Sequence, residues 1–272
     1  MLPEVSLVKM NLSKSAAVIE KLYFDSTSPC SVEEERGLQL SYKTKYQFRK
    51  ITPEVRRKIS EMKLENLDER STAQVWAEVF IRTPYMGLGN IAVDYFKRKQ
   101  KNKKIPLSTY WPLIHPWVNK IENWIHGDMA ASLYSQILEE DSKTVYPYVR
   151  AWSFSGEPWK KRMGMVSLLY YRACRRKVLP FNKMIPLVKK NLKTDHYFVQ
   201  KAVGWTLREL HNAYPRETKI FLNRYIAILS PYAFTAATEK IPMTQKEPWK
   251  KLRKEASQQR NFLLPWQPIK ND

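Results

Sequence analysis

A tryptophan and an aspartate lie four residues apart near the middle of the chain, at Trp124 and Asp128. If the helix continues through Gly127, this spacing puts an aromatic ring and a carboxylate on the same helical face. A carboxylate in a site of reduced dielectric stabilises a positive charge that develops nearby, and the π face of a tryptophan attracts the same cation. The alternative is that Asp128 is only a helix N-cap, a position that aspartate favours.

A basic segment, Lys160-Lys161-Arg162, directly follows Pro158 and Trp159. A proline ahead of this segment predicts a helix start, where free backbone N–H groups and the helix dipole favour an anion. We therefore expect the segment to bind a phosphodiester. Another basic run, residues 97–104, has no such context, and we expect it to be a solvated face.

A further tryptophan, Trp205, follows Phe198 and Ala202 at four- and three-residue spacing. The same periodicity recurs in segment after segment and indicates helices, without a convincing alternating strand between them. The sequence therefore predicts an all-α protein. At this spacing Trp205 is open to a second interpretation, as a core residue.

Proline and polar clusters mark where the helices begin. Predicted starts lie at Thr52-Pro53, Ser155–Pro158, Tyr214-Pro215 and Ser230-Pro231, with proline in the first turn. We expect Asp195 to cap the helix that contains Trp205. Asp128, Arg162 and Trp205 follow one another at roughly 34 and 43 residues, close to the period of about 40–47 residues in HEAT-type solenoids of helix pairs.

The composition indicates a polyanionic partner. The chain has 47 Lys and Arg against 26 Asp and Glu, a formal net charge of +21, which by itself allows RNA, DNA or an anionic membrane as the partner. Only seven of its 272 residues are Gly, which disfavours folds built on tight hairpins or phosphate-cradling loops. The sequence offers no signal peptide and no membrane span, so we expect a cytoplasmic protein, nucleoid-associated if it is bacterial.

Several classes of chemistry are disfavoured by missing motifs. Two cysteines, Cys30 and Cys174, lie far apart, and no metal-ligand spacing exists, so we expect neither a disulfide framework nor a metal site. The sequence lacks a phosphate loop, a His-Glu-x-x-His motif, a Gly-x-Ser-x-Gly elbow and a zinc-deaminase signature. We expect no cofactor.

The ends of the chain differ from its middle. We expect a single domain over residues 1–240, with a divergent N-terminal helical segment (1–44) in which residues 24–37 form a loop. Residues 241–272 read as a basic, partly ordered tail. Possible docking residues in this tail are Trp249, Leu263, Leu264 and Trp266.

Three strings carry a resemblance to a known family: Asn123-Trp124-Ile125-His126-Gly127-Asp128, then Trp159-Lys160-Lys161-Arg162, then Phe198-Val199-Gln200-Lys201-Ala202-Val203-Gly204-Trp205-Thr206-Leu207-Arg208-Glu209. Over roughly residues 45–240 the chain resembles the AlkD-like family of DNA alkylation repair proteins. The resemblance implies a right-handed solenoid of antiparallel HEAT-like helix pairs with a concave, basic face that binds DNA. It also implies a monomeric DNA glycosylase that removes N3- and N7-alkylated purines from duplex DNA.

The resemblance also implies roles for individual residues. The family's catalytic aspartate falls on Asp128, its active-site tryptophans on Trp124 and Trp205, and its phosphate-binding arginine on Arg162. The DNA-binding residues expected beside Arg162 are Trp159, Lys160, Lys161, Lys201 and Arg208. The chain departs from the family at Asn123, where a second tryptophan is usual, and near Phe234-Thr235, where a basic residue is expected.

The implied reaction suits these side chains. Cleavage of an N-glycosidic bond develops positive charge on the deoxyribose, which Asp128 would stabilise together with the two tryptophan rings. An alkylated purine is already cationic before the bond breaks, so the reaction requires no general acid. A second hypothesis is a HEAT-like protein that binds damaged or branched DNA without cutting a bond, and a third is a solenoid that binds an acidic protein.

Overall fold

The computed structural model describes the backbone of residues 3–102, 105–169 and 179–259, and the side chains within 12–99, 105–169 and 179–256. These residues are helical, apart from short loops, one isolated bridge and a pair of two-residue antiparallel strands, β1 (Ser28–Pro29) and β2 (Arg49–Lys50). The prediction of an all-α protein is therefore confirmed. The chain divides into two compact units, residues 1–140 and 141–272, and each is described by itself.

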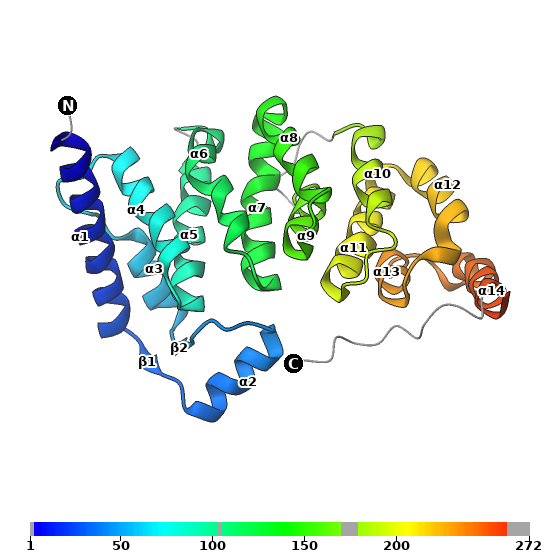
Figure 1. The fold of residues 1–272 in the computed structure, drawn as a ribbon, viewed down its shortest axis with the longest axis horizontal. Coiled ribbons are helices and arrows are strands. Elements are labelled where there is room, and N and C mark those ends of the chain that lie inside the picture. Colours follow the sequence, from blue (N-terminus) through cyan, green and yellow to red (C-terminus); the bar gives the residue numbers. More distant parts are fainter. Residues whose placement is uncertain (1–2, 103–104, 170–178, 260–272) are drawn as a thin grey trace. The chain divides into compact units, whose positions relative to one another are not determined.

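The first unit is built from seven α-helices and two 3-10 turns among its described residues (Figure 1). They are α1 (Pro3–Asp25), α2 (Val32–Tyr42), α3 (Pro53–Glu61), α4 (Glu69–Arg82), α5 (Met86–Asn102), η1 (Leu107–Tyr110), α6 (Trp111–Ile114), η2 (His115–Asn119) and α7 (Trp124–Glu140). The core is rich in aromatic rings. Phe80 stacks on Trp117 with ring centroids 4.2 Å apart, and the indole N–H of Trp117 donates to the carbonyl oxygen of Ala77 at 3.2 Å. Burial of such rings, roughly 2 kcal/mol each, fixes α4, α5 and α7 together.

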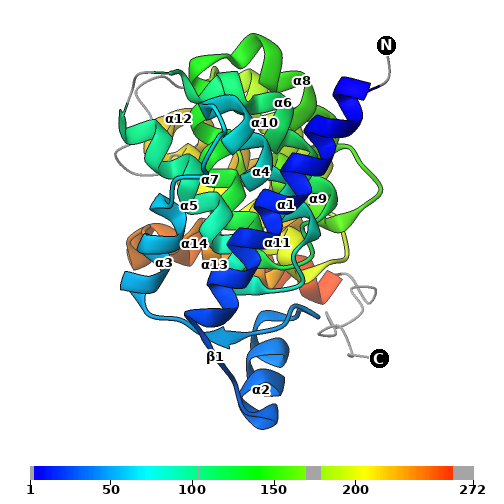
Figure 2. The same ribbon diagram turned by 90° about the vertical axis from the view of Figure 1, so that its left-hand side faces the viewer.

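The second unit has seven α-helices and one 3-10 turn within its described part. They are α8 (Ser142–Ser153), α9 (Pro158–Val166), α10 (Phe181–Lys190), α11 (Tyr197–Ala213), α12 (Pro215–Tyr225), η3 (Ile226–Ile228), α13 (Pro231–Ala237) and α14 (Met243–Gln259). Helices α8, α10 and α12 form one layer, and α9, α11 and α13 form the other (Figures 1 and 2). We call them the outer and the inner layer.

Two glycines let the helices of the second unit approach closely. A Cβ built on Gly164 of α9 would lie 2.5 Å from the backbone nitrogen of Ser153 in α8, and one on Gly204 of α11 would lie 2.5 Å from the carbonyl oxygen of Ala233 in α13. Real Cβ atoms do not come this close to backbone atoms. The two glycines therefore set how α9 and α11 pack against their neighbours.

Most predicted helix starts are confirmed. Thr52 and Ser230 are N-caps whose side chains accept from the backbone N–H groups of Val55 and Ala233, and proline occupies the first turn of α3, α9, α12 and α13. The prediction for Asp195 is wrong. Helix α11 begins at Tyr197 after an N-cap at His196, which makes no side-chain capping bond.

The expectation of a loop over residues 24–37 is wrong in part. Helix α2 begins inside this range, at Val32, because Ser31 and Glu34 form a capping box in which each side chain accepts from the other's backbone N–H. This helix buries none of its residues. It therefore carries no apolar periodicity by which it could have been predicted.

The tail is helical over residues 243–259, where α14 packs on η3. Trp249 docks as expected: it is buried, and its indole N–H donates to Asn223 Oδ1 at 2.7 Å. Arg253 donates to the carbonyl oxygens of Ile226 and Leu229 and lies 4.6 Å from the centre of the Phe234 ring. Three predicted residues of the tail, Leu263, Leu264 and Trp266, lie outside the described residues, as does Cys174.

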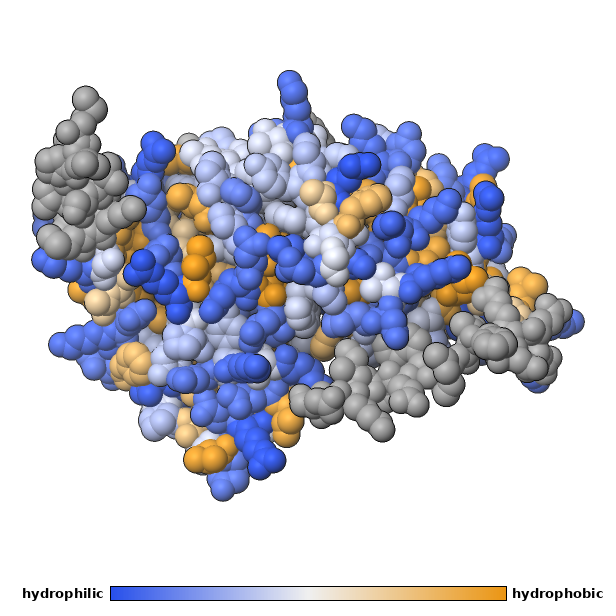
Figure 3. Space-filling view, in the orientation of Figure 1, coloured by the Kyte–Doolittle hydropathy of each residue, from blue (hydrophilic) through white to orange (hydrophobic). Residues whose placement is uncertain are grey.

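Hydrophilic residues predominate on the surface seen in Figure 3, with separate apolar residues between them. Across the described residues, no helix is both long enough and apolar enough to cross a membrane.

Candidate functional site

Trp124 is the first residue of α7, and Asp128 follows one turn later on the same face. The cap of this helix is Asn123: its Oδ1 accepts from the backbone N–H of His126 at 2.9 Å, and its carbonyl oxygen accepts from Gly127 at 3.1 Å. Asp128 lies in the second turn, so the alternative that it caps the helix is wrong. The capping role also gives a physical reason for an asparagine, rather than a tryptophan, at position 123.

The ring of Trp124 is half-buried and packs against Tyr42, the last residue of α2. Their ring centroids lie 5.8 Å apart at an interplanar angle of 60°. Tyr42 in turn stacks on Phe48, at 5.8 Å and 26°. Such aromatic pairs contribute about 0.5–1.5 kcal/mol each beyond their buried area, so the N-terminal segment fixes one side of the Trp124 ring.

The segment after α2 is tied to the residues just before α7. Glu122 Oε1 accepts from the Thr44 hydroxyl at 2.7 Å and from the backbone N–H of Lys45 at 3.1 Å, although Thr44 and Glu122 are 78 residues apart in the sequence. Tyr46 then packs its ring edge-on against His126, with centroids 4.6 Å apart. Residues 42–46 therefore form a collar around the first turn of α7, which carries Trp124.

His126 is completely buried in the first turn of α7. Its Nε2 lies 3.2 Å from the carbonyl oxygen of Met86, which requires a protonated Nε2 for a hydrogen bond. Burial lowers the pKa of this imidazole to about 4, so the ring is neutral at pH 7. A Cβ on Gly89 of α5 would lie 2.8 Å from this ring, so α5 passes close to His126 only because residue 89 is a glycine.

In the second unit, Arg162 of α9 is 4% exposed. Its Nη1 donates to the carbonyl oxygen of Phe198 at 2.9 Å, and its guanidinium lies 6.0 Å from the centre of the Phe198 ring. Trp159 packs on the same ring at 5.1 Å and on His196 at 5.9 Å. The start of α9 and the start of α11 are therefore joined through one aromatic side chain.

The two lysines that precede Arg162 differ in their surroundings. Lys160 Nζ pairs with Glu157, the N-cap residue of α9, at 2.7 Å. Lys161 has no carboxylate within ion-pair distance among the described residues. Lys161 is therefore the lysine whose charge is available to a phosphate without exchange of a partner.

Lys201, Trp205 and Arg208 lie along one face of α11 at four- and three-residue spacing. Lys201 is exposed, and Trp205 is half-buried, so Trp205 is not among the fully buried core residues. The Arg208 guanidinium lies 5.9 Å from the centre of the Trp205 ring and pairs with Glu209 and Glu239. Arg208 thus holds the Trp205 ring in place while its own charge is compensated.

The basic run at residues 97–104 is not simply solvated where its side chains are described. Arg98 is partly buried, and desolvation lowers its pKa. Lys99 pairs with Glu69 at 3.3 Å and lies 5.2 Å from the centre of the Tyr95 ring. The side chains of residues 100–104 lie outside the described part of the chain.

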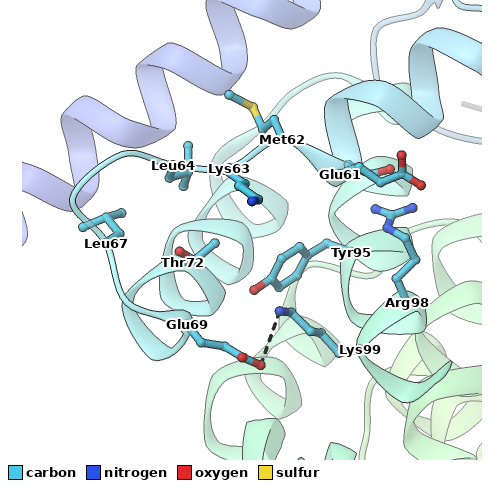
Figure 4. Close-up of a pocket in the computed structure, with 11 residues that line it drawn as sticks. Glu61, Met62, Lys63, Leu64, Leu67, Glu69, Thr72, Tyr95, Arg98 and Lys99 are labelled. Atoms are coloured by element: carbon cyan, nitrogen blue, oxygen red, sulfur yellow. Dashed lines mark ion pairs between the residues drawn. The ribbon is translucent and has the colours of Figure 1, made fainter. Parts of the chain in front are cut away.

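Arg98 and Lys99 line a cavity of about 470 Å³ between α3, α4 and α5 (Figure 4). Its other walls come from the end of α3, the connection to α4 and Tyr95. None of the predicted site residues lines this cavity. No group of three His, Cys, Asp or Glu able to hold a metal ion occurs among the residues that the structure describes.

The structure brings the predicted residues together in two sets. Trp124 and Asp128 share a face of α7 in the first unit, and the second set, Trp159, Lys160, Lys161, Arg162, Lys201, Trp205 and Arg208, lies on α9 and α11 of the inner layer. That the two sets form one site is still a prediction.

Sequence reasoning missed Tyr42, Glu122 and Tyr46, because contacts between distant segments leave no spacing pattern. Sequence reasoning also gave Phe198 no role in the site. Phe198 opens the third string of the family resemblance, and the aromatic residues near it in the sequence could have singled it out.

Comparisons with known proteins cover most of the chain. A sequence model of a family described as DNA alkylation repair enzyme matches residues 31–241. A solved structure named as a predicted DNA alkylation repair enzyme from Enterococcus faecalis aligns with a TM-score of 0.59 at 15% identity, over 80% of this chain and 99% of that one. This likeness shows a shared fold. No curated protein matches the chain significantly. The family match starts at residue 31, so it includes α2 and Tyr42.

Proposed function

The chain belongs to the DNA alkylation repair enzyme family, and from this premise we propose that it is a monofunctional DNA glycosylase acting on N3- or N7-alkylated purines in duplex DNA. Membership of the family supports a role in DNA repair. The observation that carries the finer proposal is the placement of Trp124 and Asp128 one turn apart, on the first two turns of a helix whose start is held by Asn123 and Glu122.

The proposed chemistry follows from what these side chains can do. As the bond between C1′ and the purine nitrogen lengthens, positive charge develops on the deoxyribose. The carboxylate of Asp128 stabilises this charge and orients the attacking water. The rings of Trp124 and Trp205 contribute cation–π contacts of about 0.5–2 kcal/mol each.

The proposed leaving group explains why a single carboxylate suffices. An alkylated purine is already cationic and departs as a neutral base, so no residue has to protonate it. The reaction is a hydrolysis and involves no oxidation or reduction. The proposal therefore includes neither a metal nor a cofactor, and it takes the protein to act as a cytoplasmic monomer.

The inner layer of the second unit supplies the proposed grip on DNA. Lys161 and Lys201 would contact backbone phosphates, with Trp159 nearby. Arg162 is buried and bonded to the Phe198 carbonyl, so it would have to turn outward to reach a phosphate. Lys160 and Arg208 are paired with carboxylates, so a phosphate would have to exchange with those partners. Phosphate contacts of this kind position the duplex without reading its sequence.

Release of free base is the measurement that tests this proposal. The full chain is incubated with duplex DNA containing 7-methylguanine, and the liberated base is quantified against a buffer control. The Asp128→Asn variant should lose about a hundredfold in excision rate, because removal of one preorganised electrostatic contact costs about 10²–10³-fold. Its affinity for the duplex should be unchanged or slightly higher, since a negative charge near the phosphates is gone.

The same experiment separates this function from DNA binding without catalysis. If the folded wild-type protein binds the duplex but releases no base above the control, the glycosylase proposal fails. A wild-type activity that Asp128→Asn leaves intact would overturn the role given to this carboxylate.

A further inference from the structure

The layer of the second unit that does not carry the predicted site has a large excess of basic over acidic residues. The outer helices α8, α10 and α12 contain eight Lys and Arg and a single acid, Glu217. All eight basic side chains are exposed. They are Lys143, Arg150, Lys183, Lys189, Lys190, Arg216, Lys219 and Arg224.

These cations are not compensated by carboxylates. Within the described part of the chain, none of the eight makes an ion pair. On the inner layer Lys160 and Arg208 are paired, whereas Lys161 and Lys201 make no ion pair with a described residue. Uncompensated like charges on one face repel one another and destabilise the folded state. A surface of this kind is stabilised when a polyanion binds it.

Aromatic rings lie among these cations. The Phe154 side chain is 42% exposed, and the Arg150 guanidinium and Lys190 ammonium lie 5.0 and 5.9 Å from its ring centre. Tyr148 is 40% exposed on the same helix. Lys189 of α10 lies 5.5 Å from the ring of Tyr225 in α12. Cations therefore flank the exposed ring of Phe154 and the half-buried ring of Tyr225.

The rings distinguish between kinds of polyanion. Single-stranded nucleic acid presents both phosphates and unpaired base faces, and its binding sites combine a cationic surface with aromatic side chains on which bases stack. In a duplex the base faces are hidden within the stack, and an acidic protein offers no base at all. From the exposed Phe154 between Arg150 and Lys190, we propose that the outer layer is a second nucleic-acid site that binds single-stranded DNA.

Phe154, Arg150 and Lys190 belong to neither of the two predicted sets. The outer layer would hold a displaced or flanking single strand while the inner layer holds a duplex. The proposal stands or falls independently of base excision, because it concerns the binding of undamaged strands.

Binding of a fluorescently labelled oligothymidylate to the full chain, followed by anisotropy, tests the proposal. Phe154→Ala should weaken binding at least fivefold, because base stacking on an aromatic residue is a main part of such affinity. Phe24→Ala is the matched control, since Phe24 is also a partly exposed ring (38%) below an arginine, Arg49 at 4.8 Å, but lies in the first unit. The control should bind like the wild type.

A second variant addresses the charge. The double substitution Arg150→Gln and Lys190→Gln should lower the slope of log affinity against log salt by about 1.4, at roughly 0.7 per phosphate contact on a single strand. Base release from alkylated duplex should be unchanged in both variants if excision occurs at all. Circular dichroism and melting curves verify that each variant is folded.

Three results would overturn the inference. The first is that the wild type shows no saturable binding to oligothymidylate. The second is equal binding by Phe154→Ala and Phe24→Ala, which would leave the ring without a role. The third is competition by polyglutamate as effective as that by oligothymidylate, which would make the surface a general acceptor of acidic chains.

Discussion

Tyr42 and Trp124 pack ring against ring, 5.8 Å apart between centroids, and so join the C-terminus of α2 to the N-terminus of α7. The contact is reinforced next to both residues, where Glu122 accepts from Thr44 and Lys45. One wall of the Trp124 ring is thus supplied by a segment far away in sequence. The orientation of a proposed catalytic residue therefore depends on the N-terminal part of the chain.

Substitution of Tyr42 should affect catalysis more than binding. We expect Tyr42→Ala to lower kcat for base release by about tenfold with a small change in KM, because loss of positioning reduces the fraction of productive geometry. Tyr42→Phe keeps the ring and should retain nearly full activity. Steady-state kinetics on a 7-methylguanine duplex give both constants. A change confined to KM would contradict the positioning role of Tyr42.

The two lysines at the start of α9 should differ in their effect on duplex binding. Lys161→Gln should weaken binding and reduce the salt slope by about 0.9, the value for one phosphate contact on duplex DNA. Lys160→Gln should weaken it less, because Lys160 already pairs with Glu157 at 2.7 Å. Filter binding at several salt concentrations measures both slopes. The ion-pair argument is refuted if Lys160→Gln is the more harmful change.

Gly204→Ala should destabilise the second unit. The new Cβ would lie 2.5 Å from the Ala233 carbonyl oxygen, so α13 must move away, at a cost of about 1–3 kcal/mol. Gly37→Ala is the control: Gly37 lies within α2, and its new Cβ would have nothing within 4 Å. That change should stabilise α2 by up to about 1 kcal/mol. Thermal unfolding of both variants tests the pair, and similar melting temperatures would contradict this account of α11 and α13.

His126 makes stability depend on pH. Its pKa is about 4 in the folded protein against about 6.5 when unfolded. Below pH 6.5 the unfolded chain therefore binds the proton first, and the free energy of unfolding falls until the pH reaches about 4. The full loss is about 3 kcal/mol.

Urea unfolding at pH 7.5 and pH 4.5 measures this loss. His126→Gln removes the titrating group, so its unfolding free energy should depend less on pH over this range than that of the wild type. His196 and His211, whose pKa values burial also lowers, are retained in the variant as internal controls. Equal pH dependence in the two proteins would show that His126 does not contribute.

Local signals explain which features the sequence predicted. Apolar periodicity predicted the helices, and proline with a capping residue predicted the starts at Thr52 and Ser230. The helical face shared by Trp124 and Asp128 followed from spacing alone. These features depend on neighbours within one or two turns, which a sequence displays directly.

The errors have equally local causes. The cap of α11 was predicted one residue too early: the helix begins at Tyr197, so its N-cap is His196 rather than Asp195. Helix α2 was missed because capping, not burial, starts it. The collar around α7 was missed because its contacts join elements that only the fold brings together.

Helix α2 buries no residue, and the contacts of Gln39 with the Tyr46 carbonyl and of Glu34 with Lys50 hold it in place together with Tyr42. Local unfolding of such a segment requires less free energy than unfolding of the aromatic core around Trp117. Its amide hydrogens should therefore exchange with solvent well before those of α4 and α5. We therefore expect the Tyr42 ring to leave Trp124 whenever α2 unfolds locally, whereas α7, which carries Trp124, stays packed in the core.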